Sequence, residues 1–139
     1  MREMTMMSAL LALIAPGAVV AQDLAGAHGE RAGITAVTKH VFDDATIPGK
    51  EFRVLHTSYA PGGQNPKHYH TSHVVFHVIE GVGVWQEEGK DAITLGPGDT
   101  LHVRPGIVHA HRNASTTQPL VFLEFVIVDK GQRSTVPMR

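Results

Sequence analysis

Two stretches decide the fold: residues 62–81 read GGQNPKHYHTSHVVFHVIEG, and residues 98–113 read GDTLHVRPGIVHAHRN. In the first, His68 and His70 are two residues apart, so on a strand their side chains point to the same face. His109, from a separate expected strand, can complete a set of three imidazoles. Such a set with open positions beside it suits zinc, iron, manganese, copper or nickel. The two stretches therefore predict short strands that carry a reactive metal centre.

The composition fits a single small domain. The chain has 139 residues, a formal net charge of -1 and no cysteine. It therefore has no disulfide and no thiolate ligand or nucleophile, and no basic face argues for nucleic acid. Ten histidines exceed the roughly three expected for this length, so the excess needs a chemical reason.

The first residues resemble an export signal. Arg2 precedes an apolar run over residues 6–15, and small residues follow, ending at Ala21. This order is typical of a signal peptide over residues 1–21, cleaved before Gln22. We expect a periplasmic or secreted protein with no membrane attachment after cleavage. We also expect a lead-in and first strand over 22–50, a β-barrel over 51–130 and a tail over 131–139.

The rest of the chain reads as short strands between Gly/Pro turns such as Pro61-Gly62-Gly63 and Gly96-Pro97-Gly98. Alternating apolar residues bounded by such turns favour strands, and no helical periodicity appears. Many short strands predict an all-β sandwich or barrel of the jelly-roll kind. The expected strands are 34–39, 52–59, 68–70, 74–79, 82–86, 92–95, 100–103, 109–113 and 120–128.

The glycine and histidine spacing resembles that of the cupins. The first cupin motif places Gly, five residues, His-x-His, then Glu and Gly; Gly62, His68, His70 and Gly81 match it. The second places Gly, Gly, His and Asn at fixed distances, and residues 98, 106, 109 and 113 match it. The motif proline falls one place late, at 105 instead of 104. The resemblance covers roughly residues 52–128 and implies a cupin-type jelly-roll barrel, here with a single cupin domain.

One departure affects the metal set, because Val74 stands at the position of the family's glutamate. Three outcomes stay open. His68, His70 and His109 hold the metal alone, as in three-histidine cupin dioxygenases that use ferrous iron. Alternatively, His73 turns inward through a strand bulge and makes a four-histidine site, which favours zinc, copper or nickel. In the third case the site has lost its metal.

Two further residues are candidate catalytic groups. His111 shares strand parity with His109, so it faces the same cavity as a proton shuttle or as a group that orients a ligand. Glu124 lies within the apolar run 120–126, and a buried carboxylate needs a partner. It acts as a general base, or it pairs with Arg104 or Arg112.

The resemblance implies one divalent transition metal ion per chain, whose identity stays open among iron, manganese, zinc, copper and nickel. The missing glutamate favours a three-histidine dioxygenase or oxidoreductase acting on a small organic substrate. A metal-dependent lyase or isomerase is an alternative, and so is a non-enzymatic module that binds a metal or small ligand. Because cupins often pair through strand exchange at the barrel edge, we expect a homodimer.

Overall fold

The computed structural model describes residues 33–138. Within this range no helix is long and apolar enough to cross a membrane. The described residues form ten strands: β1 (Ile34–Phe42), β2 (Lys50–Tyr59), β3 (Gln64–His70), β4 (Val74–Glu80), β5 (Gly83–Glu87), β6 (Ile93–Leu95), β7 (Thr100–Val103), β8 (His109–Asn113), β9 (Leu120–Asp129) and β10 (Thr135–Pro137).

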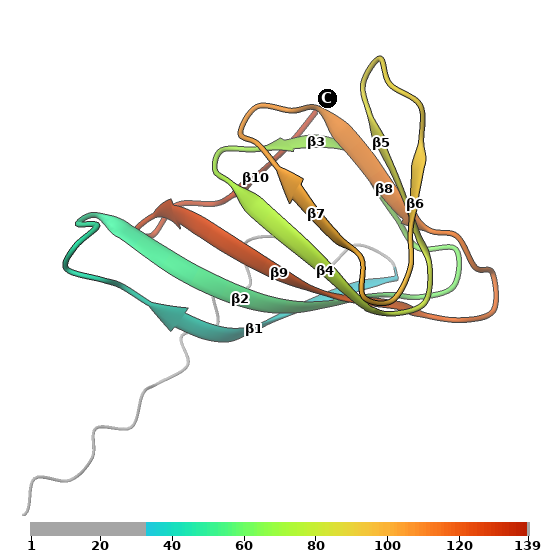
Figure 1. Cartoon of the computed structure of the whole chain (residues 1–139), viewed down its shortest axis with the longest axis horizontal. Helices are drawn as coiled ribbons and strands as arrows, with labels where there is room; N and C mark the ends of the chain where they lie inside the picture. The colour runs from blue at the N-terminus through green and yellow to red at the C-terminus, as the bar shows by residue number, and fades with distance from the viewer. Residues whose placement is uncertain (1–32, 139) are drawn as a thin grey trace, which may run out of the picture.

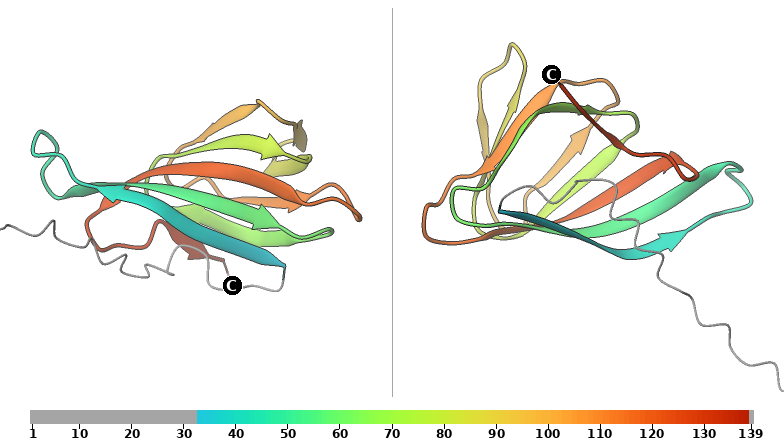
Figure 2. Two further views of the ribbon diagram at one scale, coloured as in Figure 1. Left: turned by 90° about the horizontal axis from the view of Figure 1, so that it is seen from below. Right: turned by 180° about the vertical axis from the view of Figure 1, so that it is seen from behind.

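The strands make two five-stranded antiparallel sheets that face each other (Figures 1 and 2). Sheet A has the order β1-β2-β9-β4-β7, and sheet B has the order β10-β3-β8-β5-β6. Strands β2 and β9 are neighbours although they lie far apart in the sequence, as are β3 and β8. Such crossings between two sheets are typical of a double-sheet jelly roll. The predicted all-β, cupin-type jelly roll is therefore confirmed.

Each of the nine expected strands has a counterpart in the structure. The expected tail also contributes a strand, because β10 pairs with β3 through Thr135, Val136 and Pro137. Three residues ending in proline give little strand signal, and only the pairing partner orders them. The expected signal peptide, residues 1–21, lies outside the described residues.

The core lies between the two sheets. Every second residue of β2 and of β9 is buried, as the period-2 alternation of a strand with one covered face requires. Leu55, Tyr59, Phe122 and Val126 face inward from these two strands. The core also includes Trp85 of β5 on sheet B. The rings of Tyr59 and Phe122 on sheet A lie against His111 of sheet B.

The glycine that closes the first motif has a steric reason. Gly81 has a φ of 77° in the turn between β4 and β5. A Cβ added there would lie 2.2 Å from the carbonyl oxygen of Pro119. Only glycine combines this left-handed conformation with so close an approach of two backbones.

Candidate metal centre

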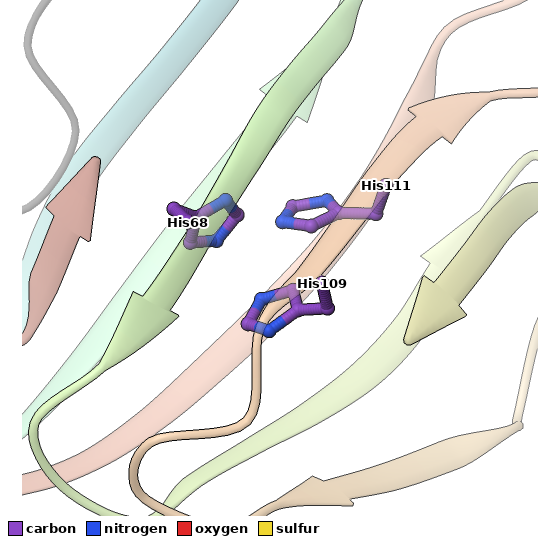
Figure 3. A group of neighbouring side chains, drawn as sticks. All are labelled: His68, His109 and His111. Atoms are coloured by element: carbon purple, nitrogen blue, oxygen red, sulfur yellow. The ribbon is translucent and has the colours of Figure 1, made fainter. Parts of the chain in front are cut away.

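Strands β3 and β8 bring the candidate ligands together. In their register His68 lies opposite His109, and Asn65 lies opposite His111. A bulge between Asn65 and His68 lets both pairs face the interior, since an extra residue restores the alternation. The ligating nitrogens of His68, His109 and His111 all lie within 4.8 Å of one another, and all three side chains are buried. Figure 3 shows these three rings turned toward a common point.

Backbone carbonyls set the tautomers of two of these rings. The Nδ1 atom of His68 lies 2.8 Å from the carbonyl oxygen of Pro66, and that of His109 lies 2.8 Å from the carbonyl oxygen of Ile107. A carbonyl can only accept, so each Nδ1 carries the proton and each neutral ring keeps its lone pair on Nε2. Neutral imidazole with its second nitrogen held by a carbonyl is the form that ligates metals.

His70 lies beside this group. Its ring centroid is 5.1 Å from that of His68 and 5.0 Å from that of His109, and its side chain is fully buried. Its Nδ1 lies 3.3 Å from the hydroxyl of Thr135 on β10. Among residues 33–138, the interior thus holds four histidines, all from sheet B, and Thr135 of β10 contacts one of them.

Aromatic rings surround the cluster. Trp85 stacks on His109 with centroids 3.9 Å apart and lies nearly parallel to His111 at 5.3 Å. Tyr59 covers His111 at 5.3 Å, and its hydroxyl lies 3.0 Å from Nδ1 of His111. These rings pack against His109 and His111 and contribute to their burial.

The structure places His73 outside this cluster. Its side chain is exposed, and its Nδ1 lies 2.9 Å from Nε2 of His102. The inward bulge considered as one of the three alternatives is not present there, because β4 pairs regularly with β7 from Val74 onward. Val74 itself is fully buried on the inner face, so strand parity turns His73 away. The four-histidine set with His73 is therefore not the arrangement seen.

Glu124 is buried within β9, with 1% of its surface exposed. It accepts a hydrogen bond of 2.7 Å from the hydroxyl of Thr57 on β2. The two arginines considered as partners, Arg104 and Arg112, are exposed. A carboxylate inside an apolar barrel is costly unless it is hydrogen-bonded, and Thr57 meets part of this need.

Sequence reasoning placed His111 in the cavity of His109 as a proton shuttle or an orienting group, and the geometry groups it with His68 and His109. Sequence reasoning gave no role to Tyr59, which contacts His111 from the opposite sheet. Alternation along β2 puts Tyr59 on the same inward face as the buried Thr57, but it does not say which side chain of the opposite sheet Tyr59 meets.

Cavities of different size border the histidine cluster. A cavity of about 30 Å³ lies next to His111, between Phe76, Trp85 and Phe122. This volume holds about one water molecule. Larger cavities of about 180 Å³ and 170 Å³ are lined in part by His109 and by His111.

Comparison with known proteins agrees with the geometry. A cupin superfamily protein from Desulfitobacterium hafniense is 15% identical with a TM-score of 0.56, covering 73% of this chain and 84% of its own. A cupin-like protein from Thermotoga maritima is 24% identical with a TM-score of 0.57, covering 75% and 84%. A DMSP lyase from Ruegeria pomeroyi is 24% identical with a TM-score of 0.54, covering 61% of this chain but only 42% of its own.

These likenesses show the fold. No functionally curated protein matches the chain. The cupin domain family matches residues 55–128, which is more than half of the chain and includes the four interior histidines. By this match and by its jelly-roll barrel, the chain belongs to the cupin family.

Proposed function

We propose that this protein is a metal-dependent cupin enzyme that acts on a small organic molecule, most simply as a dioxygenase or oxidoreductase. The observation that carries the proposal is the buried histidine group with Nδ1 of His68 and His109 held by backbone carbonyls. Clustered neutral imidazoles fit a divalent iron, manganese, zinc, copper or nickel ion. The donor set therefore fits the metal that the cupin family implies.

His68, His109 and His111 would hold this ion, with His70 adjacent. A metal in such a site supplies Lewis-acid polarisation or oxygen activation. The protein's own residues bind the substrate, orient it and move protons. The Tyr59 hydroxyl and Nδ1 of His111 are 3.0 Å apart, close enough for a proton to pass between them. Glu124 is a second candidate base, held by Thr57.

Elemental analysis of protein purified without affinity histidines or chelator tests the metal assignment. We expect one transition metal ion per chain in the wild type and loss of it in His68→Ala and His109→Ala. His77→Ala is the matched control, because that ring lies on the outer face of β4 and bonds Thr100 at 2.9 Å. Equal metal content in all four proteins would refute the site, as would a wild type that stays empty after reconstitution.

Oxygen consumption tests the reaction class. Protein loaded with ferrous iron should consume oxygen in the presence of simple β-diketones or catechols, which chelate a metal through two oxygens. No uptake across a broad panel would contradict the dioxygenase proposal. A lyase or isomerase panel on the zinc or manganese form would then be the next test, since the DMSP lyase shares this fold.

A non-enzymatic metal-binding module is the second candidate, and the closeness of four buried imidazoles favours it. A metal site closed by four imidazoles without an exchangeable water would support this function. Water-proton relaxation of the manganese- or copper-loaded protein distinguishes the two, because only an open site exchanges water rapidly with the bulk.

We also propose export, on the residue pattern of positions 1–21. Expression of the full chain followed by N-terminal sequencing of the periplasmic fraction should find Gln22 at the start of the mature protein. Full-length protein in the cytoplasm would contradict this.

A further inference from the structure

Two histidines lie together on the outside of sheet A, away from the buried cluster. His73 precedes β4 and His102 lies on β7, and both side chains are exposed. Their chain neighbours Val74 and Val103 are buried on the inner face, so the alternation of a strand turns both histidines outward. Nδ1 of His73 lies 2.9 Å from Nε2 of His102. We call these two histidines the outer pair.

Strand pairing fixes the backbone on both sides of the outer pair. Strands β4 and β7 are neighbours in sheet A (Figure 1), and His102 lies opposite Val75 in their register. The carbonyl oxygen of His73 accepts a hydrogen bond of 3.5 Å from the backbone N–H of Ile127 on β9. The two rings are stacked, with centroids 5.1 Å apart and planes at 22°. A pair that is already in place binds a ligand at a lower cost in entropy than two separate side chains do.

The outer pair can take up a metal ion without releasing a proton. Between two neutral imidazoles, one nitrogen donates the hydrogen bond and the other accepts it. When the donating ring moves its proton to its second nitrogen, both facing nitrogens present lone pairs. Both rings are exposed, so water can accept the N–H that then points outward. This neutral tautomer is the form of histidine that ligates metals.

The separation of the two nitrogens indicates which ion fits. With metal–nitrogen bonds of about 2.0–2.1 Å, two ligands at about 90° lie roughly 2.9 Å apart, and two at the tetrahedral angle lie roughly 3.3 Å apart. The observed distance of 2.9 Å therefore matches adjacent ligands in square-planar or tetragonal coordination. That geometry with nitrogen and oxygen ligands is typical of Cu²⁺ and Ni²⁺, and Cu²⁺ binds such ligands more tightly.

The surroundings of the outer pair favour the same ions. Both histidines line a groove of about 350 Å³ on the outside of sheet A, together with Phe42, Phe52 and Phe125. None of the described residues that line this groove is Asp or Glu. Hard cations such as Mg²⁺ and Ca²⁺ need oxygen ligands, whereas imidazole suits copper, nickel and zinc. A groove with two imidazoles and no carboxylate therefore excludes the abundant hard cations.

From this geometry we propose that His73 and His102 form a second metal site, a solvent-exposed Cu²⁺ site on the outside of sheet A. The proposal does not depend on a metal in the buried cluster. His73 is then a metal ligand, with His102 as its partner and not with the interior histidines. Two protein ligands leave the remaining coordination positions to water, so this ion exchanges with the solvent. Elemental analysis of protein purified without added copper therefore counts the buried site alone.

Immobilised Cu²⁺ chromatography of the untagged mature protein is the first test, because a resin reaches only exposed histidines. The wild type should be retained, and His73→Ala and His102→Ala should each elute at a lower imidazole concentration. His77→Ala is the matched control: its ring lies on the outer face of β4 and bonds Thr100 at 2.9 Å, so it should elute with the wild type. A wild type that is not retained would overturn the proposal, as would elution of all four proteins at the same imidazole concentration.

Electron paramagnetic resonance identifies the ligands. In a His68→Ala/His109→Ala background, which disrupts the buried cluster, Cu²⁺ should give a tetragonal spectrum with coupling to two nitrogens. Adding His102→Ala should raise the Cu²⁺ dissociation constant about a hundredfold, because the second imidazole no longer binds as part of the same molecule. Adding His77→Ala should leave the dissociation constant unchanged. Equal Cu²⁺ affinity with and without His102 would overturn the proposal, whatever the metal content of the buried cluster.

Discussion

Replacing Asn113 by alanine should destabilise the barrel by about 3 kcal/mol. The Asn113 side chain is 2% exposed. Its Nδ2 donates to the carbonyl oxygens of Gln118, Ala60 and Tyr59 at 2.7, 3.1 and 3.3 Å. Its Oδ1 accepts from the backbone N–H of Ser115 at 2.9 Å. One amide group has two N–H bonds, so about three full hydrogen bonds are lost, at about 1 kcal/mol each.

Urea denaturation followed by fluorescence of the single tryptophan measures this loss. Metal chelator in every sample keeps the measured loss of stability free of any contribution from metal binding. Ser115→Ala is the control, because the Ser115 hydroxyl accepts only exposed bonds, from the N–H groups of Thr117 and Gln118, and should cost about 1 kcal/mol or less. A loss below about 1 kcal/mol for Asn113→Ala would refute the reasoning that this side chain ties the end of β2 to the loop between β8 and β9.

The Asn113→Asp variant tests the donor role separately. It keeps an oxygen for the Ser115 N–H but turns a carboxylate toward three carbonyl oxygens. Its pKa in the folded protein should rise, since only the protonated form can donate. A raised folded pKa adds stability below the unfolded pKa and loses it as pH rises through the folded pKa. The variant should therefore recover part of its stability in acid, and an equal deficit at all pH values would contradict this.

Three further predictions concern the turn, the surface and the metal. Gly81→Ala should lower the free energy of unfolding by more than about 2 kcal/mol, because the added Cβ clashes with the backbone. Gly89→Ala, which has a similar φ but open space around it, should lower it by about 1 kcal/mol. Equal losses measured by urea denaturation would refute the steric argument. Lys130 lowers the pKa of the Asp43 carboxyl through a hydrogen bond and through its charge. Lys130→Gln should therefore return that pKa toward 3.8, as measured by NMR titration. An unchanged pKa would assign the shift to another cause. Metal at about 100 times its dissociation constant should stabilise the protein by about 2.7 kcal/mol, and chelator or His109→Ala should abolish the increase in melting temperature.

Much of the barrel could be predicted from the sequence because strands have a strong local signal. Alternating apolar residues between Gly/Pro turns located nine strands, and the motif spacing pointed to the cupin fold. Strand parity placed His68, His70, His109 and His111 on inward faces. The short β10 escaped notice because three residues ending at Pro137 carry no periodicity of their own, and pairing with β3 orders them.

Two features of the site could be established only from the tertiary structure. The role of His73 could not be decided from spacing, because a bulge would turn it inward and regular pairing with β7 turns it outward. The contact of Tyr59 with His111 joins strands from opposite sheets, and no local pattern encodes which inward side chains meet across the interior.

The sequence by itself determined which residues alternate, where the chain turns and which imidazoles share a strand face, because these depend on neighbours along the chain. Tertiary structure decided which atoms come within reach of one another. The bulge before His68 sets the register of β3 against β8, and the carbonyls of Pro66 and Ile107 orient Nε2 of His68 and His109. It also decided that Val37, Phe125 and Ile127 are exposed on the same face of sheet A, since neighbours across strands exist only once the strands have paired.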